Sequence, residues 1–269
     1  EINPDLAGAY IGRGNCYRHK GNFDQAVKEY RKALDIRPDH AWTYVNLGSA
    51  WLRSGDFDQA INHYTKALEI DPTLSEAYMG RASTYRYKGD YERSIADYTK
   101  AIRIDSKNAF VYWLRGVNQS KIKKYDNAIA DHNRAIELKP EDARFYCSRG
   151  YAYMKTEKYD RAIADFIKAQ NLNPEYFLAY NNHAWLLATC PEDEFRNGSK
   201  ALKLAQKSVE LNSNWYTLGT LAAAYAEMGE FKPAVKYQKK SLSLLDAKNS
   251  KRLIDKDEEI ETSKKYLNH

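Results

Sequence analysis

Short apolar segments alternate with short polar turns along the whole chain, and residues 41–74 show this arrangement most clearly. Gly48 and Trp51 lie three residues apart in the first segment, and Ala60 and Tyr64 lie four apart in the second. These spacings place each pair on one face of an α-helix. A Ser-Gly-Asp turn joins the two segments, and an Asp-Pro pair follows the second. The pattern therefore predicts two antiparallel helices that form a hairpin.

The same pattern returns at a constant step of 34 residues. Small residues, which allow close helix approach, keep this step in both segments. They are Gly14, Gly48, Ala82, Gly116 and Gly150 in the first segments and Ala26, Ala60, Ser94, Ala128 and Ala162 in the second. One hairpin leaves its outer faces uncovered, so neighbouring hairpins are expected to stack.

A 34-residue helix-turn-helix period with small residues at these places resembles the tetratricopeptide repeat. The resemblance implies an all-α fold, a right-handed α-solenoid of about seven hairpins in which each repeat contacts only its neighbours. The solenoid is expected over residues 1–251, with repeats at 7–40, 41–74, 75–108, 109–142, 143–176, 177–214 and 215–248.

Repeat six contains an insertion. Between Leu187 and Ala201 there are 14 steps where regular spacing gives nine, so five residues are inserted. Pro191 is expected to end the first helix of this repeat. The run AWLLATCP at residues 184–191 resembles the terminal repeats of many bacterial tetratricopeptide proteins.

Residues 252–269 are expected to form a C-terminal capping helix, because a solenoid needs a polar-backed element over its last apolar face. Their apolar residues are Leu253, Ile254, Ile260, Tyr266 and Leu267. A partner-binding amphipathic helix is the alternative interpretation of this segment.

Repeat four departs most from the pattern. Gln119 and His132 stand where the neighbouring repeats carry aromatic residues, and Lys123 stands where they mostly carry glycine. Polar groups at buried places cost stability unless they find partners. We interpret His132 as a packing residue and predict a weak point in repeat four.

The amino-acid composition limits the classes of function that are expected for this chain. The net charge of +6 is modest, and no groove position carries a basic residue in most of the repeats, so nucleic-acid binding is not expected. Three widely spaced cysteines form neither a metal motif nor a disulfide framework. No apolar run approaches transmembrane length. The opening Glu-Ile-Asn-Pro reads as the tail of a preceding repeat, so the compartment stays open between cytoplasm and periplasm.

Catalytic motifs are absent from the sequence. It contains no glycine-rich phosphate loop, no HExxH, no CxxC and no serine elbow. The histidines fall at unrelated places of the repeat. We therefore expect no enzymatic activity, no cofactor and no metal.

The resemblance also implies where a ligand binds, because first helices line the concave face in the tetratricopeptide family. Transferring its groove places gives ten candidate residues: Asn15, Trp42, Asn46, Arg86, Phe110, Trp113, Arg144, Tyr151, Asn181 and Trp185. The repeat pattern does not require the aromatic side chains of Trp42, Phe110, Trp113 and Trp185. Exposed aromatic residues in a concavity favour a binding site, although packing against adjacent repeats is the alternative.

One subfamily can be compared residue by residue. Tetratricopeptide domains that clamp a chaperone's C-terminal carboxylate use three cations and two asparagines. The corresponding residues are Ile11, Asn15, Asn46, Glu76 and Gly80. Both asparagines match, but all three cations are missing, so a carboxylate clamp is not expected.

The sequence thus favours a non-enzymatic scaffold that binds a peptide or helix of another protein in its groove. Two alternatives remain open. One is a helical-repeat nucleic-acid binder, and the other is the recruiting domain of a larger enzyme or envelope assembly. The ligand and the oligomeric state are not determined by the sequence.

Overall fold

The computed structural model describes residues 5–247, and the helices in this range form successive helical hairpins joined by short turns. No strand occurs in the described range. The chain forms two compact units, Glu1–Pro140 and Glu141–His269, and each is described by itself. The expected capping helix at 252–269 lies outside the described residues.

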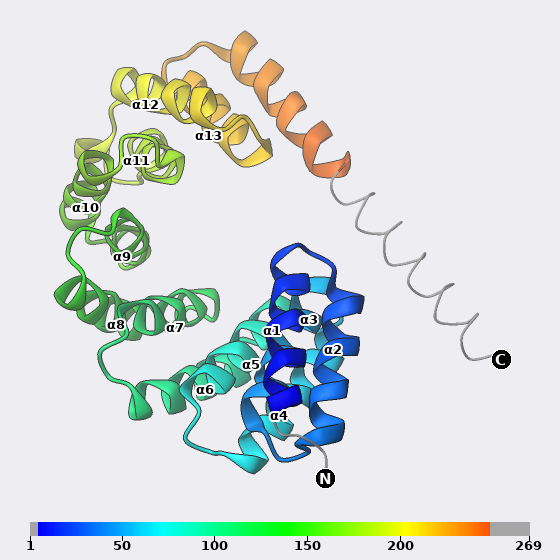
Figure 1. Cartoon of the computed structure of the whole chain (residues 1–269). Coiled ribbons are helices and arrows are strands. Elements are labelled where there is room, and N and C mark those ends of the chain that lie inside the picture. Colours follow the sequence, from blue (N-terminus) through cyan, green and yellow to red (C-terminus); the bar gives the residue numbers. More distant parts are fainter. Residues whose placement is uncertain (1–4, 248–269) are drawn as a thin grey trace. The chain divides into compact units, whose positions relative to one another are not determined.

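Unit 1 contains four hairpins that match the first four predicted repeats. Each odd-numbered helix packs against the even-numbered helix that follows it, as α1 and α2 show (Figure 1). The helices are α1 (Asp5–His19), α2 (Phe23–Ile36), α3 (Ala41–Ser54), α4 (Phe57–Ile70), α5 (Ser75–Lys88), α6 (Tyr91–Ile104), α7 (Ala109–Lys121) and α8 (Tyr125–Leu138).

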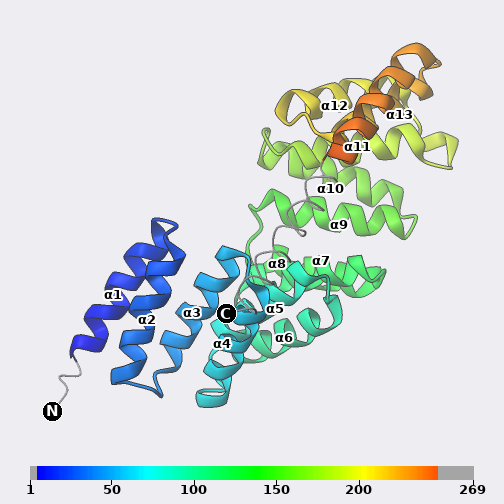
Figure 2. The same cartoon turned by 90° about the vertical axis from the view of Figure 1, so that its right-hand side faces the viewer.

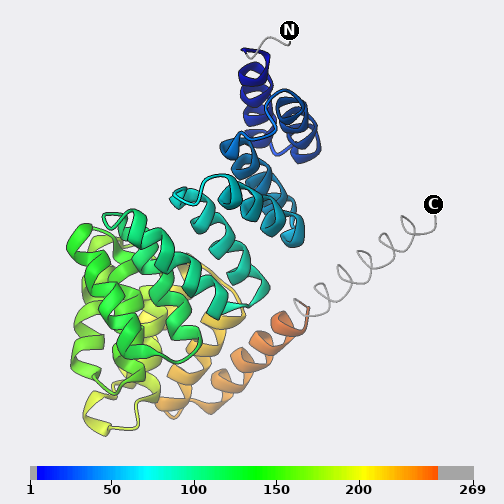
Figure 3. The same ribbon diagram turned by 90° about the horizontal axis from the view of Figure 1, so that it is seen from below.

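Unit 2 contains the remaining hairpins in successive layers (Figure 2). Its helices are α9 (Ala143–Lys155), α10 (Tyr159–Leu172), α11 (Phe177–Thr189), α12 (Gly198–Leu211) and α13 (Trp215–Glu227). A further helical segment, residues 231–247, follows α13 and is coloured orange in Figure 3. This segment is the second helix of repeat seven.

The two helices of a hairpin pack closely because a glycine of the first helix contacts an aromatic ring of the second. A Cβ atom added to Gly48 would lie 2.9 Å from the ring of Tyr64, and Gly80 of the next repeat meets the same ring. Tyr64 is therefore enclosed by small residues from two repeats, and it is almost completely buried. Gly116 and His132 repeat this contact in repeat four, with imidazole in place of the phenol ring. His132 is completely buried, which agrees with its interpretation as a packing residue.

The turn inside the hairpins of repeats one to five and seven contains one residue with a left-handed backbone. Gly55 has a φ of 95° at this place. Lys123 and Glu157 hold the same place in repeats four and five, with φ values of 62° and 59°. A side chain costs free energy in this conformation, because Cβ approaches the following carbonyl oxygen.

In repeat six, α11 ends at Thr189 and a short 3-10 turn, η1 (Asp193–Phe195), follows where the sequence predicts the insertion. A serine hydrogen bond that occurs in both repeat six and repeat seven shows how many residues the insertion contains. Ser241 Oγ donates to the carbonyl of Trp215, 26 residues earlier, in repeat seven. Ser208 Oγ makes the equivalent bond in repeat six to Phe177, 31 residues earlier. The difference of 31 minus 26 is the five inserted residues.

An arginine–aspartate pair that the repeat pattern did not predict recurs inside the hairpins. Arg81 pairs with Asp97 at 2.7 Å, and Arg115–Asp131 and Arg149–Asp165 repeat the pair at the same 16-residue separation. Arg81 Nη1 also donates to Thr65 Oγ1 of the preceding repeat at 2.9 Å. These aspartates are buried, so the pairs tie the helices of a hairpin together.

Candidate functional site

The ten predicted groove residues fall into both units. Unit 1 carries Asn15, Trp42, Asn46, Arg86, Phe110 and Trp113, and unit 2 carries Arg144, Tyr151, Asn181 and Trp185. The two sets are therefore described separately. A continuous groove through all ten residues stays a prediction.

In unit 1 the predicted residues lie on several first helices. Trp42 on α3 is 45% exposed. Phe110 on α7 is half-buried, and Lys139 Nζ lies 5.0 Å from the centroid of its ring. Asn15 Oδ1 accepts a hydrogen bond from Tyr30 Oη at 2.7 Å, so this amide already has a partner within its own hairpin. Arg86 lies over the ring of Tyr87.

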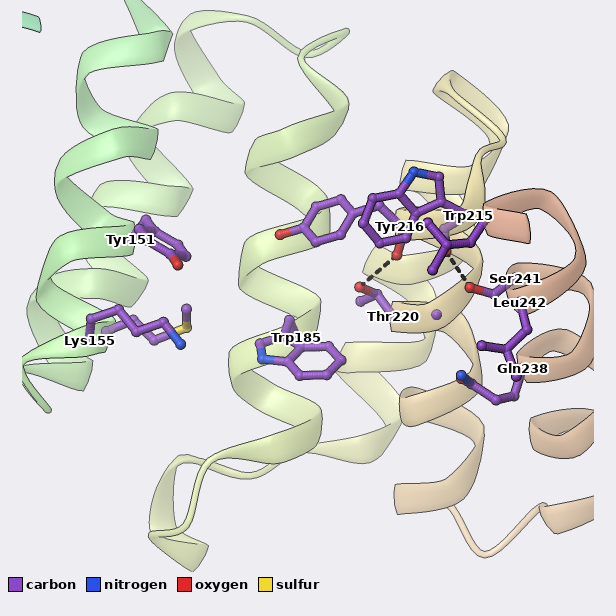
Figure 4. A pocket seen from close by; sticks show the side chains of 12 residues that line it. Tyr151, Lys155, Trp185, Trp215, Tyr216, Thr220, Gln238, Ser241 and Leu242 are labelled. Carbon is purple, nitrogen blue, oxygen red and sulfur yellow. Dashed lines mark hydrogen bonds between the residues drawn. The ribbon is translucent and has the colours of Figure 1, made fainter. Parts of the chain in front are cut away.

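In unit 2 two predicted residues, Tyr151 and Trp185, come together at one pocket of about 410 Å³ (Figure 4). We call it the aromatic pocket. Its walls come from α9, α11, α13 and the helical segment 231–247. The lining residues are Tyr151, Met154, Lys155, Trp185, Trp215, Tyr216, Gly219, Thr220, Gln238, Ser241, Leu242 and Leu245.

Aromatic side chains form one side of the aromatic pocket. Trp215 and Tyr216 contact edge to face, with ring centroids 5.7 Å apart. Trp185 is 40% exposed. In Figure 4 its indole lies between Tyr151 and Lys155 on one side and Gln238 and Leu242 on the other. Leu242 is 49% exposed, so the opposite wall is also apolar and accessible.

Three hydroxyl groups of the aromatic pocket donate hydrogen bonds within the protein. Tyr216 Oη donates to Asn182 Oδ1 at 2.8 Å. Burial raises the pKa of Tyr216 to about 12, so this hydroxyl keeps its proton at neutral pH. Ser241 Oγ donates to the Trp215 carbonyl at 2.6 Å, and Thr220 Oγ1 donates to the Tyr216 carbonyl at 3.3 Å (Figure 4). A ligand therefore meets mainly apolar surface here.

Lys155 carries the one charge among the described residues that line the aromatic pocket. Its side chain is exposed, and its Nζ lies 5.6 Å from the centroid of the Tyr151 ring. No carboxylate lines this pocket within residues 5–247. Its electrostatic preference is therefore for a neutral or acidic ligand.

The aromatic pocket lies at a defined place in the repeat. In repeat two, Val45, Tyr64 and Leu68 pack with Ala77, which lies near the start of the first helix of repeat three. The corresponding residues of repeat seven are given by the 34-residue register as Gly219, Gln238 and Leu242. All three line the pocket. Tyr64 is thus replaced by the smaller and flexible Gln238, and Val45 by glycine, which leaves room.

The other two predicted residues of unit 2 do not line the aromatic pocket. Asn181 is completely buried in α11, which corrects its expected place on the groove surface. Arg144 is half-buried, and its guanidinium donates to Asp142 at 2.8 and 2.6 Å. Trp215, Tyr216 and Leu242 were not among the predicted groove residues. The absence of an aromatic residue at Gln238 in repeat seven was the available signal.

Two buried reactive side chains of unit 2, His183 and Cys147, have shifted pKa values. Burial lowers the pKa of His183 to about 4 and raises the pKa of Cys147 to about 12. His183 is therefore neutral and Cys147 is a thiol at neutral pH. Within residues 5–247, no group of three or more histidine, cysteine, aspartate or glutamate residues could hold a metal ion. In the same range, no helix has the length and apolar character to span a membrane.

Comparison with protein families gives one consistent result. Models described as tetratricopeptide repeat or TPR repeat match residues 5–73, 63–96, 82–121, 121–157, 143–176 and 216–244. No curated protein matches the chain.

Solved structures give the same fold. A tetratricopeptide repeat protein from Parabacteroides merdae has a TM-score of 0.73 at 19% identity, covering 89% of this chain and 93% of that one. The MamA protein has a TM-score of 0.58 at 28% identity, covering 64% and 93%. YrrB, described as a TPR protein with an unusual peptide-binding site, has a TM-score of 0.60 at 23% identity, covering 74% and 97%. With its repeated hairpins, its glycine–ring contacts and these matches, the chain belongs to the tetratricopeptide repeat family.

Proposed function

We propose that this chain is a non-enzymatic scaffold that binds a peptide or helix of a partner protein, and that the aromatic pocket is its principal anchor site. The carrying observation is the pocket itself, in which Trp185, Trp215 and Leu242 offer accessible apolar surface between helices. Aromatic anchors in concave sites give large contact area at low entropy cost.

Two further observations support a polypeptide ligand. The pocket hydroxyls of Tyr216, Ser241 and Thr220 are already bonded within the chain, so the ligand is selected by shape and apolar contact. YrrB, which shares the fold, is described as having a peptide-binding site.

The test begins with a displayed library of random peptides, each about four helical turns long, selected on the full chain. A selected peptide is then titrated into the native chain and into the Trp185→Ala variant. If Trp185 is an anchor, the substitution weakens binding roughly thirty-fold, or about 2 kcal/mol. Trp42→Ala is the matched control, because Trp42 has nearly the same exposure but lies in unit 1. It should change the affinity less than about two-fold, as peripheral contacts do.

An unchanged affinity in Trp185→Ala would overturn the proposed site. A loss only in Trp42→Ala would move the site to unit 1.

Salt separates this function from nucleic-acid binding. Neutralising several phosphates releases counterions, so affinity for nucleic acid falls by about 10³ or more between about 50 and about 200 mM salt. Apolar burial releases no ions, so a selected peptide should lose less than about ten-fold over the same range. Tight, strongly salt-dependent binding of single-stranded RNA that is insensitive to Trp185→Ala would favour the nucleic-acid alternative.

A further inference from the structure

We propose that Lys155 makes the aromatic pocket selective for a partner segment that carries an aspartate or glutamate side chain close to its apolar anchor residue. This inference rests on the proposed function, because it names the chemistry of the ligand that the same pocket would take. The apolar walls bind the anchor, and Lys155 selects the charge beside it.

Lys155 has no acidic partner in the protein. It stands at the end of α9, its side chain is exposed, and it forms no ion pair within residues 5–247. Its Nζ lies 5.6 Å from the centroid of the Tyr151 ring, and both residues line the aromatic pocket. Contact with a ring face neutralises no charge, so the three donors of the ammonium group are available to an anionic ligand.

The acidic residues at this end of the hairpins line a different hollow. Glu157 follows Lys155 by two residues, and the inserted segment of repeat six contributes Glu192 and Glu194. These three glutamates line a separate hollow at the turn of repeat five, together with two basic residues. The lining of the aromatic pocket therefore carries a net positive charge among the described residues.

The other polar groups of the aromatic pocket are neutral. Gln238 is exposed on the wall opposite Lys155, and its side-chain amide forms no hydrogen bond in the part of the chain that the structure describes (Figure 4). An amide offers both a donor and an acceptor, so it suits the peptide backbone of a ligand and does not discriminate by charge. Selection by charge is therefore left to Lys155.

The size of the pocket limits where the acidic residue of the ligand can stand. Lys155 and Trp185 line one pocket of about 410 Å³, and Figure 4 shows the lysine side chain beside the indole. In a helical ligand, residues three or four positions apart lie on the same face. The acidic residue is therefore expected within one helical turn of the residue that contacts Trp185.

The ion pair selects among apolar ligands and does not bind a ligand by itself. An exposed ion pair contributes up to about five-fold in affinity, which is less than the roughly thirty-fold expected of an aromatic anchor. A basic residue at the same place of the ligand would be repelled by Lys155. The preference should thus appear as a bias in which apolar peptides bind.

The experiment selects one displayed library of random peptides, each about four helical turns long, on two full chains: the native protein and the Lys155→Glu variant. Peptides selected on the native chain should carry aspartate or glutamate within four residues of their anchor more often than the unselected library does. Peptides selected on Lys155→Glu should carry lysine or arginine there. The anchor is the apolar residue whose replacement by alanine weakens binding most. Circular dichroism checks that both chains have the same helix content.

A thermodynamic cycle then tests whether the two charges contact each other. A fluorescein-labelled peptide selected on the native chain is titrated into the native chain and into Lys155→Gln, beside the same peptide with its acidic residue changed to the amide. Each single change should weaken binding about five-fold, and both together also about five-fold, because they remove the same ion pair.

Lys121→Gln is the matched control. Lys121 is exposed and stands 34 residues before Lys155, at the same place of repeat four, but it does not line the aromatic pocket. This variant loses the same charge as Lys155→Gln, and it should change the affinity of the labelled peptide less than about two-fold.

Three outcomes would overturn the inference. The two chains select the same residues beside the anchor. The losses from Lys155→Gln and from the peptide change multiply to about twenty-five-fold, as they do for groups that do not interact. Lys121→Gln weakens binding as much as Lys155→Gln, which would assign the effect to net charge alone. Selected peptides that still depend on Trp185 in these cases would leave the proposed function intact, whereas recovery of no peptide on either chain would overturn both.

Discussion

At two hairpin turns, a residue with a side chain adopts the left-handed backbone conformation that favours glycine. Four glycines hold positive φ values in the described hairpins, whereas Lys123 and Glu157 hold the same place in repeats four and five. Their side chains are tolerated because the turn is exposed and the flanking helices impose its geometry.

Replacing either residue with glycine should therefore stabilise the protein. Lys123→Gly and Glu157→Gly each remove the Cβ strain, a gain of about 0.5–1 kcal/mol after the entropy cost of glycine. Urea unfolding followed by circular dichroism measures this change. Gly55→Ala is the reciprocal control and should destabilise by about 1 kcal/mol. Neutral or opposite effects would show that the turns are not strained.

His183 makes stability depend on pH. Burial lowers its pKa in the folded chain to about 4 from the usual value of 6.5. The unfolded chain therefore binds a proton at higher pH than the folded chain does. The stability associated with neutral His183 is fully present above pH 6.5 and is lost as the pH falls towards 4.

Between about pH 7 and about pH 5, the native chain should thus lose about 1–2 kcal/mol more stability than His183→Gln, whose side chain does not titrate. Urea titrations of both chains at the two pH values decide this. Parallel losses in the two chains would mean that His183 is protonated in the folded state.

At the level of helices and hairpins, the sequence predicted most of the fold. The 34-residue register located the turns and the repeat-six insertion, because small residues and helix breakers act locally. The Arg–Asp pairs were not predicted, since their partners stand 16 residues apart on different helices and depend on how the hairpin closes. Asn181 was misplaced because the groove register alone does not determine burial.

Only two of the residues that line the aromatic pocket were among the predicted groove residues. Tyr151 and Trp185 stand at groove positions that the family resemblance supplied. Trp215 and Leu242 belong to repeat seven, and Leu242 corresponds in register to Leu68, which packs with the next first helix in repeat two. This change of role depends on the three-dimensional surroundings of repeat seven, which a repeat pattern does not describe.

Repeat four remains the predicted weak point. Its turn is strained at Lys123, and Gln119 Oε1 is buried with no partner among the described residues. Local opening should therefore cost less free energy in residues 109–142 than in residues 41–74. Amide hydrogen exchange under native conditions measures both ranges in one sample. Equal protection would refute the prediction.

At the scale of the whole molecule, the repeats share one packing pattern, and the candidate binding site lies where a repeat departs from it. Most repeats use an aromatic residue to fill the contact with the next first helix, as Tyr64 does. Repeat seven uses Gln238 there, and the accessible surface of the aromatic pocket results. Repeats six and seven both depart from the pattern at this place, with Ala205 and Gln238, and Gln238 lines the candidate recognition site.

Photo-crosslinking tests this central claim most directly. A peptide selected on the full chain carries a benzophenone group at its main apolar residue, and mass spectrometry identifies the labelled protein residues. We predict labels on pocket residues such as Met154, Trp185 and Leu242, and their loss with excess unlabelled peptide. Labels confined to α12 or to unit 1 would contradict the assignment of the aromatic pocket as the binding site.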